Sequence, residues 1–170
     1  MLNNNLTSKF LNFGPIILLY FLSISEVDAS FENYFEILSF NLQLIIIYFW
    51  VLKRPAILGN GHIFFAGLIN DVVMGYPLAI SSLTYLSVSF VATYIKNMSV
   101  NTTLISDWFT FLIALLVSNL LFGILASYFS QIEIGLNEIS YNTLFTLLFF
   151  PLFWFIFSAY NSILRVGKNV

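Results

Sequence analysis

Long apolar runs separated by short polar segments dominate this chain. Five apolar blocks stand out, at residues 10–24, 34–52, 62–95, 108–128 and 141–164. A helix that crosses the hydrocarbon core of a bilayer needs about 20 mostly apolar residues. The third block would reach about 51 Å as one helix, which is too long for a core of about 30 Å. It also contains Gly75-Tyr76-Pro77, a helix-ending signal. The pattern therefore predicts two helices there, at about 58–74 and 78–95, and six spans in all.

The placement of the basic residues supports this division. Lys and Arg are enriched in cytoplasmic loops of membrane proteins. With six spans and a cytoplasmic N-terminus, one side carries every basic residue: Lys9, Lys53, Arg54, Lys96, Arg165 and Lys168. A single crossing at residues 62–95 would move Lys96, Arg165 and Lys168 to the other side. A re-entrant loop in place of the third span would keep the same parity, so that alternative stays open.

Composition narrows the class of protein. Hydrophobic residues make up 59% of the 170 residues and charged residues 8%, whereas soluble domains carry about 25% charge. This excludes a soluble globular domain, a disordered tail and a nucleic-acid binder. The chain has no cysteine and one histidine, His62, so it offers a poor metal site. We expect a single all-α membrane domain over residues 1–170, without metal or cofactor.

Polar residues concentrate at one place inside the third block. Gly67, Asp71 and Gly75 are spaced by four residues, which puts them on one face of a helix. Small residues at this spacing let a neighbouring backbone approach closely. Asp71 is the only acid away from the ends of a predicted span, and a carboxyl group there should face the bundle interior and find a partner. Two roles stay open: a ligand for a proton, ion or substrate, or a structural cap that joins the helix ends broken at Gly75-Tyr76-Pro77.

Two further features have more than one interpretation. Asn119, Gly123 and Ser127 repeat the spacing of four in the fifth span. They could pack against the face of Gly67, Asp71 and Gly75, with Asn119 donating to Asp71, or they could be ordinary small-residue packing. The basic residues Lys53, Arg54, Lys96, Arg165 and Lys168 are interpreted as topology anchors. For Lys53 and Arg54, a contact with a partner is the alternative.

Signatures of catalysis are missing from the sequence. There is no Ser/His/Asp set, no H-E-x-x-H and no Gly-rich phosphate loop. Chemistry with two carboxylates would need a second acid to pair with Asp71 in the interior of the spans, and the sequence has none away from the span ends. The sequence therefore predicts that the protein is not an enzyme.

The stretch from Tyr48 to Leu83 resembles the family of rod shape-determining protein MreD. The family pattern has a Trp near the end of the second span and a Pro after it. It continues with Gly-Leu, an Asp, a Gly and Pro-Leu-Gly. The matching positions are Trp50, Pro55, Gly67, Leu68, Asp71, Gly75, Pro77 and Leu78. Ala79 stands where the family has Gly. A late Pro in the last span and a basic end, Pro151 and Arg165, also match.

The resemblance implies a function that composition alone does not. It implies a non-enzymatic, multi-pass protein of the bacterial cytoplasmic (inner) membrane, with both termini in the cytoplasm. Such a protein is a scaffold of the cell-elongation machinery that supports peptidoglycan synthesis and cell shape. Its expected partners are MreC first, then RodA, a class B penicillin-binding transpeptidase and MreB, with the lipid bilayer around it. The implied fold is similar to the S-components of energy-coupling-factor transporters. A small-molecule-binding subunit of such a transporter is therefore the alternative function.

Overall fold

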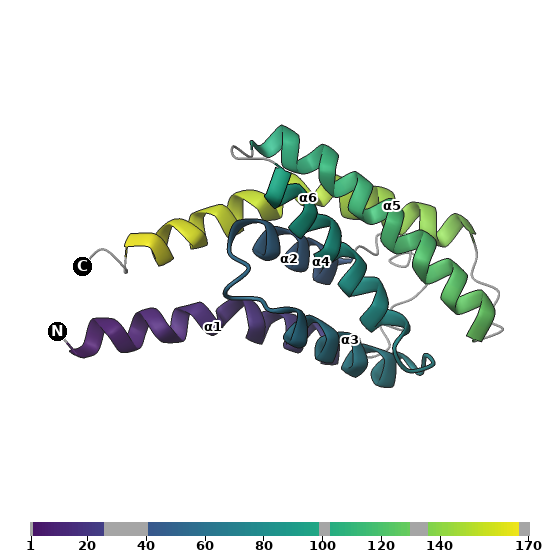
Figure 1. Cartoon of the computed structure of the whole chain (residues 1–170), viewed down its shortest axis with the longest axis horizontal. Helices are drawn as coiled ribbons and strands as arrows, with labels where there is room; N and C mark the ends of the chain where they lie inside the picture. Colours follow the sequence, from purple (N-terminus) through teal and green to yellow (C-terminus); the bar gives the residue numbers. More distant parts are fainter. Residues whose placement is uncertain (1, 26–40, 99–102, 130–135, 167–170) are drawn as a thin grey trace.

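The computed structural model describes residues 2–25, 41–98, 103–129 and 136–166, and these ranges are helical apart from short connections. Figure 1 shows the six helices they form. In chain order they are α1 (Leu2–Ser25), α2 (Leu42–Lys53), α3 (Asn60–Met74), α4 (Ile80–Met98), α5 (Leu104–Phe129) and α6 (Leu136–Val166). The described part of the chain is therefore all-helical, as the pattern of apolar blocks predicts.

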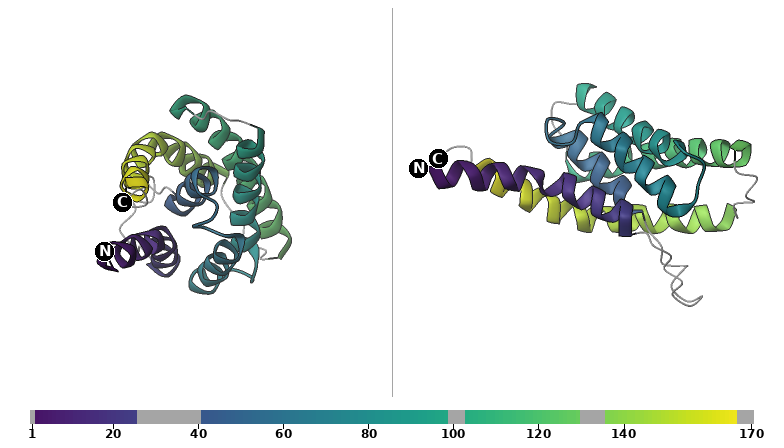
Figure 2. Two further views of the ribbon diagram at one scale, coloured as in Figure 1. Left: turned by 60° about the vertical axis from the view of Figure 1, so that its left-hand side comes forward. Right: turned by 90° about the horizontal axis from the view of Figure 1, so that it is seen from below.

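Helix α2 lies at the centre of the bundle. Every residue from Gln43 to Leu52 is buried, and α2 packs against α1, α4, α5 and α6. The left view of Figure 2 shows the other helices arranged around it. A helix that is apolar on all sides is stable only when other elements cover all of it. The unbroken apolar run of residues 44–52 thus accounts for the central position of α2.

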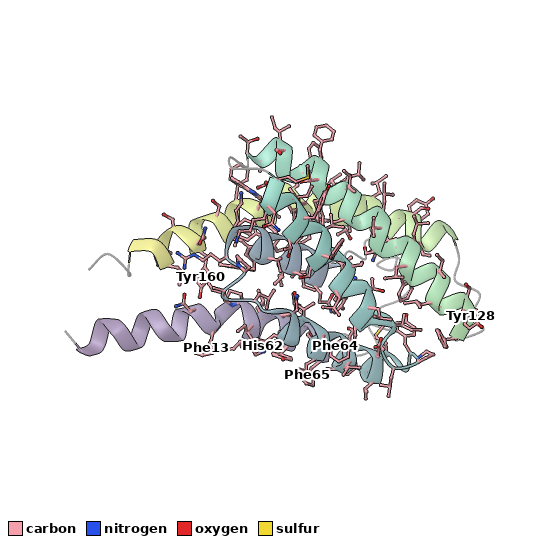
Figure 3. The ribbon with its side chains drawn as sticks, viewed as in Figure 1. Phe13, His62, Phe64, Phe65, Tyr128 and Tyr160 are labelled. Atoms are coloured by element: carbon pink, nitrogen blue, oxygen red, sulfur yellow. The ribbon has the colours of Figure 1, made fainter. Side chains whose placement is uncertain are left out.

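The outer helices carry large apolar side chains on their exposed faces. Phe90 on α4 is 74% exposed, Leu120 on α5 67% and Phe155 on α6 62%. Figure 3 shows Phe65 and Tyr128 on the outer surface as well. Within the described residues, two helical segments are long and apolar enough to cross a membrane, Leu104–Phe129 and Ile139–Leu164. A bundle that hides polar groups and exposes apolar ones is suited to lipid.

Both ends of the described chain lie at the same end of the bundle. Figures 1 and 2 show the start of α1 and the end of α6 together, projecting past the other helices. The α3–α4 connection and the end of α5 lie at the opposite end. This is the arrangement that an even number of alternating helices produces.

The limits of the six helices differ from those of several predicted spans, and the spans themselves stay a prediction. The first helix begins at Leu2 rather than near residue 10, because the polar residues 3–5 continue the helix. Helices α5 and α6 also exceed the predicted 108–128 and 141–164. Helix α4 begins at Ile80 rather than 78, because residues 77–79 form a turn. Of the predicted span 34–52, residues 34–40 lie outside the described residues. The predicted break between the third and fourth helices is confirmed.

Candidate functional site

The connection between α3 and α4, which we call the α3–α4 joint (residues 75–79), is built on the end of α3. Gly75 has φ +69° and donates its N–H to the carbonyl of Asp71. The N–H of Tyr76 donates to the same carbonyl at 2.9 Å. A left-handed residue after the last helical turn is the usual end of a helix, and glycine takes that conformation at little cost. Gly75 therefore ends α3 and turns the chain back toward α4.

The carboxylate of Asp71 closes the joint from inside. Its Oδ2 accepts the N–H of Ala79 and its Oδ1 accepts the N–H of Ser81, both at 2.8 Å. The side chain is fully buried. The first N–H groups of a helix lack partners within it, and a carboxylate there satisfies them and interacts favourably with the helix dipole. Asp71, which belongs to α3, thus caps the start of α4. This contact fits the structural one of the two roles that the sequence left open.

Ala79 holds an unusual backbone conformation just before α4. Its φ is +82°, the only positive φ of a non-glycine among the described residues. In that region the Cβ of an L-residue crowds its own backbone, at a cost of roughly 1–2 kcal/mol. The hydrogen bond from Ala79 to Asp71 helps to hold this conformation. The joint therefore needs a backbone shape that glycine would adopt more easily.

Gly67 brings the two helices of the hairpin into backbone contact. A Cβ built on Gly67 would lie 2.4 Å from Ser82 Cα and 2.6 Å from Ser82 N. Ser82 also donates its hydroxyl to the carbonyl of Phe64 at 3.0 Å. Gly67 thus packs against α4 as its small size predicts. Gly75 was predicted to lie on the same packing face as Gly67. It is exposed instead, because it forms the turn after α3. Pro77 is half-buried in that turn.

Further buried polar side chains connect the hairpin of α3 and α4 to α1 and α2. Gln43 on α2 donates to Asn70 Oδ1 at 3.4 Å and to the carbonyl of Leu22 at 3.5 Å. Asn70 in turn donates to Ser81 Oγ at 3.1 Å. Sequence reasoning missed Gln43 and Asn70. The signal for Gln43 was a lone amide in an otherwise apolar stretch, and for Asn70 its position beside Asp71.

Of the two interpretations of the stripe of small residues on α5, the pairing of Asn119 with Asp71 is not found. Asn119 donates to Thr143 Oγ1 on α6, and nothing lies within 4 Å of a Cβ built on Gly123. The reason is that the N–H groups of Ala79 and Ser81 already occupy the carboxylate of Asp71. Helix α5 contributes a ring contact to the joint instead, with the ring centre of Phe122 5.7 Å from that of Tyr76. The stripe of small residues on α5 therefore does not pack against the α3–α4 joint.

A second buried carboxylate, Asp107, lies at the opposite end of the bundle. Lys53 Nζ lies 2.7 Å from Asp107 Oδ2, and the indole N–H of Trp154 donates to the same oxygen at 2.8 Å. Asp107 is 1% exposed and the Lys53 side chain 15%. We call these three residues the charge cluster. It gives Lys53 an internal contact that its interpretation as a topology anchor did not include.

Three of the other basic residues lie at the ends of helices. Lys96 is exposed in the last turn of α4, and the backbone N–H of Arg54 caps α2 through the carbonyl of Trp50. Arg165 is in the last turn of α6. Lys168 lies outside the described residues. Their role as anchors stays a prediction.

Comparisons with protein-family models, with curated proteins and with solved structures gave no match to this chain. The properties of the site therefore come from its own geometry. Among the residues that the structure describes, no three His, Cys, Asp or Glu side chains form a group that could hold a metal. A surface hollow of about 500 Å³ lies between α4 and α5, lined by Asn60, Leu83, Leu86, Ser87, Phe90, Thr93 and Val117. Asp71 is not among its lining residues.

The chemistry open to the two carboxylates follows from their partners. Backbone N–H groups occupy both oxygens of Asp71, and a lysine and an indole occupy one oxygen of Asp107. Groups engaged in this way fix the positions of helices. The candidate site is therefore a structural joint that sets the shape of the hairpin formed by α3 and α4.

Proposed function

We propose that this chain is a multi-pass membrane scaffold of the MreD type, which acts without catalysis in the machinery that elongates rod-shaped bacteria. In this proposal it lies in the cytoplasmic membrane with both termini inside the cell. It binds MreC, and through that contact it works with RodA, a class B penicillin-binding transpeptidase and MreB. The proposed fold is similar to that of energy-coupling-factor S-components, a likeness of fold that does not imply transport.

The proposal rests on one observation, the place in the fold of the residues around Asp71 that match the family pattern. Four of the positions that match the family pattern, Gly67, Asp71, Gly75 and Pro77, belong to the α3–α4 joint or its immediate contact, and so does Ala79, where the family has Gly. Gly67 permits the helix contact, Asp71 caps α4, and Gly75 ends α3. Residues spread over thirteen positions thus contribute to one local shape. A resemblance by chance would not be expected to select residues that depend on one another in this way.

Ala79 supports the proposal although it departs from the family pattern. The family has Gly at this position, and here the backbone takes φ +82°, a region that favours glycine. The alanine therefore occupies a glycine-like conformation, so the joint has the backbone shape that the family residue suits best.

The mechanism of a scaffold needs surfaces and no chemistry. The exposed faces of α4, α5 and α6 are rich in large apolar side chains, such as Phe90, Leu120 and Phe155. Within a bilayer, helices associate through close packing and hydrogen bonds. The capped hairpin and the central α2 hold these faces in fixed positions. We propose that MreC packs its membrane helix against this outer surface.

Co-purification tests the proposal directly. The tagged full chain is expressed in a rod-shaped bacterium whose own MreD is depleted, and membranes are solubilised in mild detergent. We expect MreC to co-purify and rod shape to be restored. Gly67→Ala should lower both, whereas the matched variant Gly123→Ala should leave both unchanged, since nothing lies near that position.

Two results would contradict the scaffold proposal. One is a normal level of the chain in the membrane with no MreC bound and no effect on cell shape. The other is recovery of a pair of ATPase subunits instead of MreC, which would favour the transporter alternative.

A further inference from the structure

Helix α6 contains a proline whose missing hydrogen bond is replaced from α5. Pro151 lies inside α6 and has no N–H, so the carbonyl four residues earlier, that of Leu147, loses its helical donor. The indole N–H of Trp108 donates to this carbonyl at 2.9 Å. A side chain of α5 therefore supports α6 at the weakest point of its backbone.

The charge cluster holds α6 on the other side of the same proline. Trp154, three residues after Pro151, donates to Asp107 Oδ2, which also contacts Lys53. Lys53 Nζ lies 5.8 Å from the centre of the Trp154 ring. Asp107 and Trp108 are adjacent on α5, so two neighbouring residues hold α6 before and after Pro151. Beyond this point α6 contacts α2 through aromatic rings, with Phe157 packed against Phe49 and Trp50.

The charge cluster carries a high cost in desolvation free energy for a contact that only stabilises the fold. Asp107 Oδ1 is buried and has no hydrogen-bond partner among the described residues. A buried ion pair gains little net stability, because both charges leave water, and an unsatisfied buried acceptor lowers that gain further. Replacing a buried ion pair by apolar residues of similar volume is often neutral or stabilising. The geometry therefore suits a contact that fixes a position and can be released.

We propose that Lys53, Asp107 and Trp154 form a releasable latch, and that Pro151 is the hinge about which residues 152–166 of α6 move when it opens. The moving part lies at the end of the bundle where both described termini meet (Figure 1). Residues 136–150 stay against α5, held by the Asn119–Thr143 and Trp108–Leu147 hydrogen bonds. This inference stands on the geometry of α2, α5 and α6 and does not depend on the proposed partner.

Spin labels can measure the movement, because the chain has no cysteine of its own. Phe65→Cys on α3 provides a fixed reference, paired with Ala159→Cys beyond the hinge or with Leu144→Cys before it; all three positions are exposed. Ala159 is about 12 Å along the helix from Pro151. A change in kink of about 20° would therefore move it by about 4 Å. The full chain is measured in lipid nanodiscs by double electron–electron resonance.

The latch is opened by Lys53→Met together with Asp107→Leu, which removes both charges, leaves none uncompensated and also removes the acceptor for the indole N–H of Trp154. We expect the distance from 65 to 159 to gain a second population shifted by about 4 Å, while the distance from 65 to 144 stays unchanged. Trp154→Phe should give the same result. Adding Pro151→Ala to the double variant should remove the second population, because residue 151 can then donate to Leu147 and stiffen the helix.

Three outcomes would overturn the inference. If both distances stay unchanged, the charge cluster is a static contact. If both shift, the bundle has loosened as a whole. If the second population persists with Pro151→Ala, the movement does not occur at Pro151.

Discussion

Asp71 and Asp107 are both buried carboxylates, yet they are held in different ways. Asp71 uses both oxygens, and its donors are backbone N–H groups eight and ten residues further along the chain. Asp107 uses one oxygen, and its donors are side chains of Lys53 and Trp154, which come from two other helices. The second oxygen of Asp107 has no hydrogen-bond partner among the described residues. One carboxylate completes a local turn, and the other joins distant helices at an energetic cost.

The comparison separates two uses of buried charge in this helical bundle. Backbone N–H groups at a helix start need an acceptor whatever the side chains are, so the bonds of Asp71 satisfy groups that the fold itself creates. The pair of Lys53 and Asp107 satisfies only charges that the pair itself introduces. We therefore expect removal of Asp71 to damage the hairpin formed by α3 and α4. Neutralising both members of the pair should change position more than stability.

The largest effect is expected when the pair is broken on one side. Lys53→Met leaves Asp107 buried without its counter-charge, which should cost about 3–5 kcal/mol in the free energy of unfolding. The double variant Lys53→Met/Asp107→Asn should recover most of this loss. Unfolding in a denaturing detergent, followed by tryptophan fluorescence, measures both. A double variant as unstable as the single one would show that the pair itself stabilises the fold.

A smaller loss is expected at the contact between α3 and α4. In Gly67→Ala the new methyl group would overlap the backbone of Ser82, and overpacking of this kind costs typically 1–3 kcal/mol. Gly123→Ala is the matched control, because its site is open and alanine favours a helix. The same unfolding assay should show a loss for the first variant only. Equal behaviour of the two would contradict the close backbone contact at Gly67.

The smallest effect should be a gain in stability at Ala79. Ala79→Gly relieves a positive φ worth about 1–2 kcal/mol, while glycine adds about 0.5–1 kcal/mol of backbone entropy cost. The net gain should be up to about 1.5 kcal/mol. Ala159→Gly, at an exposed helical position, should instead lose stability. If Ala79→Gly also lost stability, the left-handed conformation at position 79 would be contradicted.

The α3–α4 joint could be predicted from the sequence because its parts are close along the chain. Gly75 and Pro77 mark the break, and Asp71 precedes that break by about one helical turn, so local geometry brings its carboxylate near the freed N–H groups. The limits of the helices were harder to predict. Residues 3–5 are helical although they are polar, and residues 77–79 form a turn inside an apolar block, so hydropathy marks neither limit.

The charge cluster could not be predicted in the same way. Lys53 and Asp107 are 54 positions apart and Trp154 follows 47 positions later, so their contact depends on how α2, α5 and α6 pack. Each residue alone resembles an ordinary interfacial residue at the end of a span. The pairing of Asn119 with Asp71 failed for the same reason, since equal spacing along two helices does not establish that the helices touch.

The central claim is that Asp71 acts as a structural cap, and the variant Asp71→Asn tests it most directly. An amide has one acceptor oxygen, so Asn keeps one of the two backbone hydrogen bonds, whereas Asp71→Leu keeps neither and should lose about 1–3 kcal/mol. Rod-shape rescue and protein level are measured in the same cells for both variants. The account predicts that shape follows protein level, with Asn between the parent chain and Leu. Normal protein level with lost rod shape in Asp71→Asn would contradict it, because the charge itself would then be required.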